Sequence, residues 1–257
     1  MPLPSIKQRV RESFERAAST YDGAAVVQRR VCDRLLEELD PAVLPPAHIL
    51  DAGCGTGYGA RRMHQRWPAA HITGVDFAPA MLSLAQYDSE ACIAADIEEL
   101  PFAADCFDLW WSNLTIQWCD ATSVFSEAAR ILKPGGLLAL STLGPHTFHE
   151  LRAAFSSVDQ HRHTLPFSEP DTIRAALASA GFSDITLLRE KQSVYYVDLK
   201  TLLRSVKDIG AHNVGDGARS GMLGRVAWQQ VEASYEQHRK PAGLPASYDV
   251  ILCYARK

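Results

Sequence analysis

The chain has 257 residues, of which 47% are hydrophobic and 22% charged, and its formal net charge is −4. This is the profile of an ordinary soluble protein that can bury a core without disulfides or metals. Because the chain has 26 basic and 30 acidic residues, it lacks the basic excess typical of nucleic-acid binders. The opening Met1-Pro2-Leu3-Pro4 lacks the apolar segment of a signal peptide, and no apolar run approaches the roughly 20 residues that span a bilayer. We therefore expect a cytoplasmic protein with no nucleic-acid or membrane partner.

Two helices are predicted ahead of the first strand. Apolar residues recur at three- and four-residue spacing over 6–39, with a pause at Tyr21 and Asp22. The pause predicts a break between the two helices, and the Asp40-Pro41 pair ends the second one.

Strands and helices then alternate through residue 142. Short apolar runs and stretches of helical periodicity follow one another, an order that predicts βαβ units with parallel strands and right-handed crossovers. The expected strands are 48–52, 71–75, 92–95, 107–112 and 137–142, and the expected helices are 58–66, 79–86 and 123–132.

The last third of the chain is less regular. A helix over 170–180 is closed by Gly181, and strands are expected over 185–197 and 248–254 with helical segments between them. Pairing these two strands would add an antiparallel edge to the sheet. The predicted fold class is a doubly wound α/β, Rossmann-like sheet with additional helices.

No metal site is expected. The six cysteines are scattered without a Cys-x-x-Cys pair, so we interpret them as reduced thiols that pack as small apolar residues. His146, His149, His161 and His163 lie in one polar segment, but their spacing matches no usual zinc site.

The most informative segment is Ile49-Leu50-Asp51-Ala52-Gly53-Cys54-Gly55-Thr56-Gly57, an apolar strand followed by three alternate glycines. Glycine allows positive φ and close approach of a ligand to the backbone. A strand-to-helix turn of this kind lies at the carboxyl edge of a parallel sheet, where α/β proteins bind nucleotides. We therefore expect an adenine-type cofactor here.

The glycines alone leave two kinds of cofactor open. Gly55-Thr56-Gly57-Tyr58-Gly59-Ala60 followed by Asp76 fits the dinucleotide fingerprint of NAD enzymes. However, Asp51 directly precedes the turn, where a carboxylate would repel a pyrophosphate and would favour a cationic sulfonium and amine. Asp96-Ile97 after the third strand suits an adenine ring, and Asn113 ends the fourth strand in the same row. These residues favour a cationic methyl donor over NAD.

Together with the Leu132-Lys133-Pro134-Gly135-Gly136 turn, these motifs resemble the class I S-adenosylmethionine-dependent methyltransferases over residues 48–143. The resemblance implies a seven-stranded sheet with an antiparallel last strand. The glycine turn would cradle the methionine moiety, Asp76 would hold the ribose, and Asp96 with Ile97 would hold the adenine. The resemblance implies that the residues that bind the cofactor are Asp51, Gly53, Cys54, Gly55, Gly57, Asp76, Phe77, Met81, Asp96, Ile97 and Asn113.

Three segments outside the glycine turn are similar to the malonyl-acyl-carrier-protein O-methyltransferases of biotin synthesis. They are residues 14–22, 111–118 and 205–211, so this similarity runs nearly from end to end. It implies methyl transfer to the free carboxylate of a malonyl thioester on acyl-carrier protein or coenzyme A. One departure is Ser247-Tyr248-Asp249 where relatives often have Thr-Tyr-His, and we assign no role to position 249.

A carboxylate acceptor is already ionised at neutral pH, so the reaction needs positioning and exclusion of water rather than a general base. We expect Tyr21 and Trp118 to wall the methyl-transfer chamber. An anionic acceptor also favours a fixed cation, for which Lys207 is the first candidate and Arg152 the second.

The whole chain, residues 1–257, is expected to form one methyltransferase domain. Within it we expect an N-terminal helical lid over 1–40, a cofactor-binding core over 46–143, and a substrate-side half over 144–257 with a helical insert at 199–241. The alternatives are a methyltransferase for another small carboxylic acid, a non-catalytic module that binds S-adenosylmethionine, and, more remotely, an NAD-dependent oxidoreductase.

Overall fold

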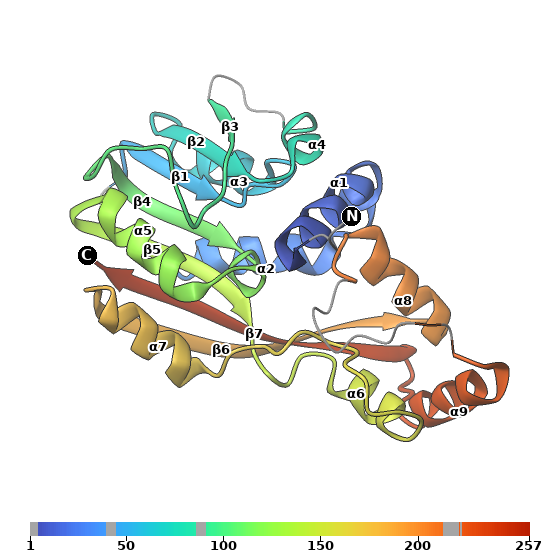
Figure 1. The fold of residues 1–257 in the computed structure, drawn as a ribbon. Helices are drawn as coiled ribbons and strands as arrows, with labels where there is room; N and C mark the ends of the chain where they lie inside the picture. The colour runs from blue at the N-terminus through green and yellow to red at the C-terminus, as the bar shows by residue number, and fades with distance from the viewer. Residues whose placement is uncertain (1–4, 40–44, 86–90, 213–220, 222) are drawn as a thin grey trace.

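A computed structural model describes residues 5–39, 45–85, 91–212, 221 and 223–257. Its centre is a seven-stranded sheet in the order β3-β2-β1-β4-β5-β7-β6 (Figure 1). The neighbours among β1 to β5 pair in parallel, whereas β7 runs antiparallel to both β5 and β6. The predicted doubly wound sheet with an antiparallel last strand is therefore confirmed. The strands are β1 His48–Ala52, β2 His71–Asp76, β3 Cys92–Ala94, β4 Phe107–Asn113, β5 Leu132–Leu143, β6 Ser183–Tyr196 and β7 Leu244–Arg256.

Helices cover both faces of the sheet. Successive strand residues point to opposite faces, and Trp111 accordingly packs with residues of α2 and α3 while Trp110 packs with those of α5 and α7. Both tryptophans are fully buried. The helices are α1 Ile6–Ala24, α2 Val26–Glu37, α3 Tyr58–Arg66, α4 Pro79–Leu82, η1 Ile116–Trp118, α5 Ala121–Ile131, α6 His149–Ser156, α7 Pro170–Ser179, α8 Leu199–Asp208 and α9 Arg225–Glu236.

Helix α1 lies outside these two layers, beside the carboxyl ends of the parallel strands (Figure 1). It packs against α4 and α8, and its residue Ala18 is buried with Ala78 and Met81. Within the described residues, none of the helices combines the length and the apolar character needed to cross a membrane.

The predicted break between the first two helices is wrong in position. Helix α1 continues through Tyr21 and Asp22 to Ala24, and the chain turns at Ala25, where ψ is +42°. The apolar pattern pauses because Tyr21 lines a cavity instead of the core.

Other predicted boundaries also differ from the structure; for example, β7 begins at Leu244 and not at 248. Strand β5 begins at Leu132 rather than 137, because Lys133–Gly136 form a bulge within it: Phe107 pairs with Leu132 and Leu109 with Leu137. Helix α4 ends at Leu82, whereas the prediction extended to Gln86, which lies outside the described residues. The Asp40-Pro41 pair also lies outside them.

Candidate active site

The glycine turn follows β1 and has the backbone geometry that glycine permits. Gly53, Gly55 and Gly57 have φ values of 78°, 55° and 82°. The N–H groups of Gly53 and Cys54 both donate to the carbonyl of Val75 in β2, at 2.7 and 3.0 Å. A Cβ atom on Gly55 would meet no atom within 4 Å, so this turn exposes its backbone to open space.

Asp76, at the end of β2, holds the glycine turn through a hydrogen bond to its backbone. Its Oδ2 accepts the N–H of Gly55 at 3.0 Å and its Oδ1 that of Ala78 at 2.9 Å. Burial raises the pKa of Asp76, and these backbone hydrogen bonds oppose the shift. The carboxylate is thus held in place at a strand tip.

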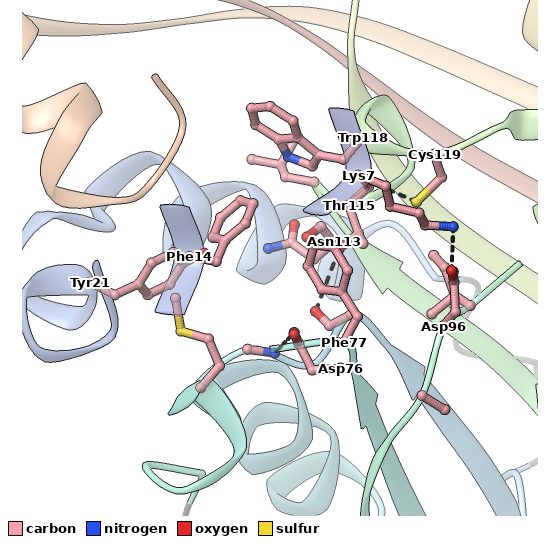
Figure 2. A pocket seen from close by; sticks show the side chains of 16 residues that line it. Lys7, Phe14, Tyr21, Asp76, Phe77, Asp96, Asn113, Thr115, Trp118 and Cys119 are labelled. Carbon is pink, nitrogen blue, oxygen red and sulfur yellow. Dashed lines mark hydrogen bonds and ion pairs between the residues drawn. The ribbon is translucent and has the colours of Figure 1, made fainter. Parts of the chain in front are cut away.

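A cavity opens between the strand tips and α1. Counted with space open to solvent, it measures roughly 600 Å³, within the range usual for small-molecule sites. Figure 2 shows Tyr21 at one side of this cavity and Asp96 at the other, with Asp76, Asn113 and Trp118 between them. The residues predicted from the sequence that line it are Gly53, Gly55, Asp76, Phe77, Met81, Asp96, Ile97, Asn113, Tyr21 and Trp118.

The other predicted residues do not line this cavity. Asp51, before the glycine turn, and Cys54, within it, are buried, and Gly57 precedes α3 as its N-cap. Lys207 lies on α8, which packs against α1. Arg152 lies on α6 and lines a separate cavity.

Asp51 has the most perturbed carboxyl group near the site. It is 2% exposed, and its Oδ2 has no hydrogen-bond partner among the described residues. Burial, followed by the charge of Asp76, raises the pKa of Asp51 to about 7, while the N–H of Ala60 opposes the shift. A cation bound nearby would favour the ionised form of Asp51.

Helix α1 supplies the wall opposite the strand tips. Lys7, Phe14 and Tyr21 line the cavity, and their spacing of seven residues puts all three on one helical face. The rings of Phe14 and Trp118 meet edge to face, with centroids 5.5 Å apart. Burial, followed by the charges of Asp76 and Asp22, raises the pKa of the Tyr21 hydroxyl well above its ordinary value. Tyr21 is therefore a neutral hydrogen-bond donor at physiological pH.

Polar contacts fasten α1 at both ends. Near its start, Lys7 forms ion pairs with Asp96 and with Glu98, the latter at 2.9 Å. Near its end, the Thr56 hydroxyl donates to Asp22 at 2.6 Å and thereby joins α1 to the glycine turn. The Thr20 hydroxyl donates to the carbonyl of Asp208 in α8 at 2.7 Å. The helix thus bridges both ends of the cavity.

Lys7, Phe14, Thr115 and Cys119 also line the cavity but were not among the predicted site residues. The seven-residue spacing of Lys7 and Phe14 from Tyr21 is the sequence signal that would have identified the first two. Among the described lining residues, Lys7 carries the one positive charge. Thr115 is a close neighbour of the turn, since a Cβ on Gly53 would lie 2.8 Å from the Thr115 Cβ.

The guanidinium of Arg152 is engaged in local structure. It donates to the carbonyls of Thr147 and Pro145 and, at 3.3 Å, to the Thr164 hydroxyl. Burial lowers the pKa of Arg152, and the charge of Glu150 opposes the shift. These bonds tie the segment after β5 to the loop that follows α6.

Position 249, to which no role was assigned, has a structural one. Arg189 binds the Asp249 carboxylate in a bidentate pair at 2.7 and 2.6 Å, and the N–H of His146 donates to the same carboxylate at 3.0 Å. Burial would raise the pKa of Asp249, but these partners lower it. Asp249 therefore anchors the segment after β5 to the antiparallel part of the sheet.

These features suit a cationic nucleoside ligand. The lining provides carboxylates at Asp76 and Asp96, apolar surface at Ile97 and Met81, and backbone without a Cβ at Gly55. Among the described residues, no group of three or more His, Cys, Asp or Glu side chains is arranged to hold a metal.

Comparisons with known proteins agree with this geometry. Residues 50–140 match the family described as a methyltransferase domain. Over 98% of its length, the chain is 50% identical to the malonyl-(acyl-carrier protein) O-methyltransferase of Dechloromonas aromatica (strain RCB), of which it covers 95%. It is 44% identical to the protein of the same name from Methylovorus sp. (strain MP688), with 98% and 89% covered. It is also 38% identical to the biotin biosynthesis bifunctional protein BioHC of Teredinibacter turnerae, and the match covers 99% of this chain and 48% of that protein.

Solved structures share the fold at low sequence identity. Phosphoethanolamine N-methyltransferase 2 of Haemonchus contortus, in complex with phosphomonomethylethanolamine and S-adenosylhomocysteine, aligns over 99% of this chain and 60% of its own at 17% identity and a TM-score of 0.61. The YcgJ protein of Bacillus subtilis aligns over 89% and 98% at 16% identity and the same TM-score.

Proposed function

Because this chain belongs to the malonyl-(acyl-carrier protein) O-methyltransferase family, we propose that it methylates the free carboxylate of a malonyl thioester with S-adenosylmethionine as donor. The product would be the methyl ester used in biotin synthesis. The observation that carries this proposal is the gathering of Asp76, Asp96 and Gly55 around one cavity in a chain that is half identical to such an enzyme over nearly its whole length.

The donor would lie along the strand tips. The backbone of Gly53 and Gly55 would contact the methionine moiety, Asp76 the ribose hydroxyls, and Asp96 with Ile97 the adenine. Phe77, Met81 and Asn113 would complete the walls, and Asp51, Cys54 and Gly57 would keep the turn in the shape that receives the donor. The acidic rim supports this arrangement, because carboxylates stabilise a ligand that carries a sulfonium and an ammonium group.

When bound, S-adenosylmethionine supplies an electrophilic methyl group: an acceptor carboxylate oxygen forms the new C–O bond as the C–S bond breaks, which leaves a neutral thioether. The residues of this chain would align the two partners and keep water out. Phe14 and Trp118 form an apolar wall that would strip the acceptor carboxylate of hydration. The neutral hydroxyl of Tyr21 would donate a hydrogen bond within the chamber.

A lid made by residues 1–40 is part of this proposal, together with the core at 46–143 and the substrate-side half at 144–257 with its insert at 199–241. The fastening of α1 at Lys7 and Asp22 supports it. Lys207 is the first proposed cation for the acceptor carboxylate and Arg152 the second, and turnover by Lys207→Ala and Arg152→Ala tests each. Arg152 would have to leave its bonds to the carbonyls of Thr147 and Pro145 to take this role. Near-normal rates in both variants would remove them from the mechanism.

The carrier-bound thioester is the proposed physiological acceptor, with malonyl-coenzyme A as a second form. The proposed compartment is the cytoplasm, since Cys32, Cys106, Cys119 and Cys253 are free thiols, as expected where the environment is reducing.

The test is mass spectrometry of malonyl-loaded carrier protein after incubation with the enzyme and S-adenosylmethionine. We expect a gain of one methyl group, which Asp76→Ala abolishes. Asp108→Ala, which removes an acid at the opposite edge of the sheet, is the control and should remain active. Methylation of free diacids with no reaction of the thioesters would instead identify a methyltransferase for another small acid. Donor binding without any methylation would identify a non-catalytic module.

A further inference from the structure

Two more cavities continue from the candidate active site. The first shares Trp118 and Cys119 with the cofactor cavity. At its far end it shares Arg162, Leu165, Pro166 and Phe167 with the second. Residues that line both of two cavities lie between them, so the three cavities follow one another. We call the first of these two cavities, from Trp118 to Phe167, the outer path.

The outer path has mostly apolar walls. Ile6 and Val10 of α1, Ile116 of η1 and Ile173 of α7 line it. Thr142 and Gln117 add polar atoms to its lining, and a hydrogen bond of 3.3 Å joins their side chains. Such a lining suits a narrow, flexible chain that is largely apolar but carries a few amide groups.

Arg162 places a positive charge where the outer path meets the second cavity. Arg162 is exposed, and no hydrogen bond or ion pair of its side chain occurs within the described part of the chain. The neighbouring charges are already engaged: Arg152 is bonded to the carbonyls of Thr147 and Pro145, and Asp159 lies 2.8 Å from His163. Arg162 is therefore available to an anion that arrives from outside.

We propose that the outer path binds the phosphopantetheine arm of the malonyl thioester and that Arg162 contacts the phosphate of that arm. This inference rests on the proposed function. The carboxylate end would pass Trp118 to reach the donor, the amides would lie near Gln117 and Thr142, and the phosphate would meet the guanidinium where the path opens. A guanidinium matches phosphate through paired N–H groups.

The experiment compares three malonyl thioesters: malonyl-carrier protein, malonyl-coenzyme A, and the N-acetylcysteamine thioester, which has no phosphate. For Arg162→Ala we expect KM to rise about three- to tenfold with the first two. With the third we expect KM to be unchanged, and kcat should stay within about twofold throughout. Arg162→Glu should raise KM further with the phosphate-bearing substrates, because it places like charges together. Arg256→Ala, which removes an exposed arginine at the opposite edge of the sheet, is the matched control.

The outcomes separate this inference from the proposed function. If Arg162→Ala raises KM equally for all three thioesters, the arginine acts on the carboxylate or on the fold, and the proposed phosphate contact is wrong. An unchanged KM for all three would also overturn it. Failure of the wild-type protein to methylate any of them would overturn the proposed function itself. Unchanged circular dichroism and thermal midpoint of the variants would show that they fold.

Discussion

Lys7, in the first turn of α1, forms an ion pair with Asp96, which follows β3 eighty-nine residues later in the chain. Glu98 joins the same ammonium group at 2.9 Å. Burial alone would lower the pKa of Lys7, but these two carboxylates raise it. The contact places the start of the N-terminal helix beside the proposed adenine position, and a carboxylate has enough lone pairs to accept both Lys7 and an adenine amine.

Removing this ion pair should weaken cofactor binding. We expect Lys7→Ala to raise the Kd for S-adenosylhomocysteine two- to fivefold, because a half-exposed pair contributes up to about 1 kcal/mol. Isothermal titration calorimetry measures the effect, and raised salt should shrink the difference. Lys133→Ala is the matched control: Lys133 pairs with Asp108 at 2.7 Å with a similar exposed fraction, 37% against 35% for Lys7. Equal Kd values for the wild type and Lys7→Ala would contradict the anchoring role of Lys7.

Asp51 should make stability depend on pH in an unusual direction. Its pKa is raised to about 7 in the folded protein, against about 3.9 when unfolded. The folded state therefore binds the extra proton between about pH 4 and 7, and the Asp51 contribution to stability falls as pH rises through that window, by about 1.4 kcal/mol per unit at most. The difference in unfolding free energy between wild type and Asp51→Asn, measured by urea titration at several pH values, should show this slope. A flat difference would argue against a raised pKa.

The same group should couple binding to protons. A cationic donor favours ionised Asp51, so S-adenosylmethionine should bind more tightly as pH rises from 6 to 8 and should release a proton on binding. Calorimetry in buffers of different ionisation enthalpy counts that proton. Asp51→Asn should abolish the release, while Asp108→Asn, at the opposite edge of the sheet, should leave it intact.

Substitution of Gly53 should be more harmful than the conformational strain alone explains. Gly53 and Gly135 have nearly the same φ, 78° and 77°, so alanine strains both by roughly 1 kcal/mol. A Cβ on Gly53 would also collide with Thr115, whereas one on Gly135 would meet nothing within 4 Å. We expect Gly53→Ala to lose about 2–3 kcal/mol of unfolding free energy and its affinity for S-adenosylhomocysteine, and Gly135→Ala to lose about 1 kcal/mol with affinity retained. Equal losses in the two variants would show that Thr115 moves aside.

The pair between Arg189 and Asp249 should stabilise the antiparallel part of the sheet. Asp249 is 7% exposed and is bound by Arg189 and by the His146 N–H. We expect Asp249→Asn to cost about 1–3 kcal/mol, because the paired charge and its hydrogen bonds are lost together. A double-mutant cycle with Arg189→Met, followed by urea unfolding, should give a coupling free energy of about 1 kcal/mol. Additive losses would mean that the two side chains stabilise the fold independently.

Local sequence patterns determined the central fold. Alternating strands and helices predicted the parallel sheet, and the boundaries of β1 and α3 agree with the structure, because burial periodicity and glycine turns act over a few residues. The class I methyltransferase fold was evident from motifs at the strand tips. The narrower malonyl-acyl-carrier-protein family was evident from residues 14–22, 111–118 and 205–211, and relatives that match almost the whole chain confirm it. Those tips meet at one sheet edge whatever the rest of the chain does.

Tertiary structure decided which distant residues share the cavity. Tyr21 shares one helical face with Lys7 and Phe14 because α1 runs unbroken past it, and α1 packs on α4. Arg152 is bonded to nearby carbonyls, and Lys207 lies on α8, which packs against α1, and does not line the cavity. Charge and helical periodicity are written in the sequence, but the partner of a charged side chain depends on how separate elements pack. The contacts of Lys7 with Asp96 and of Asp249 with Arg189 join segments far apart in the chain, and only the folded structure specifies them.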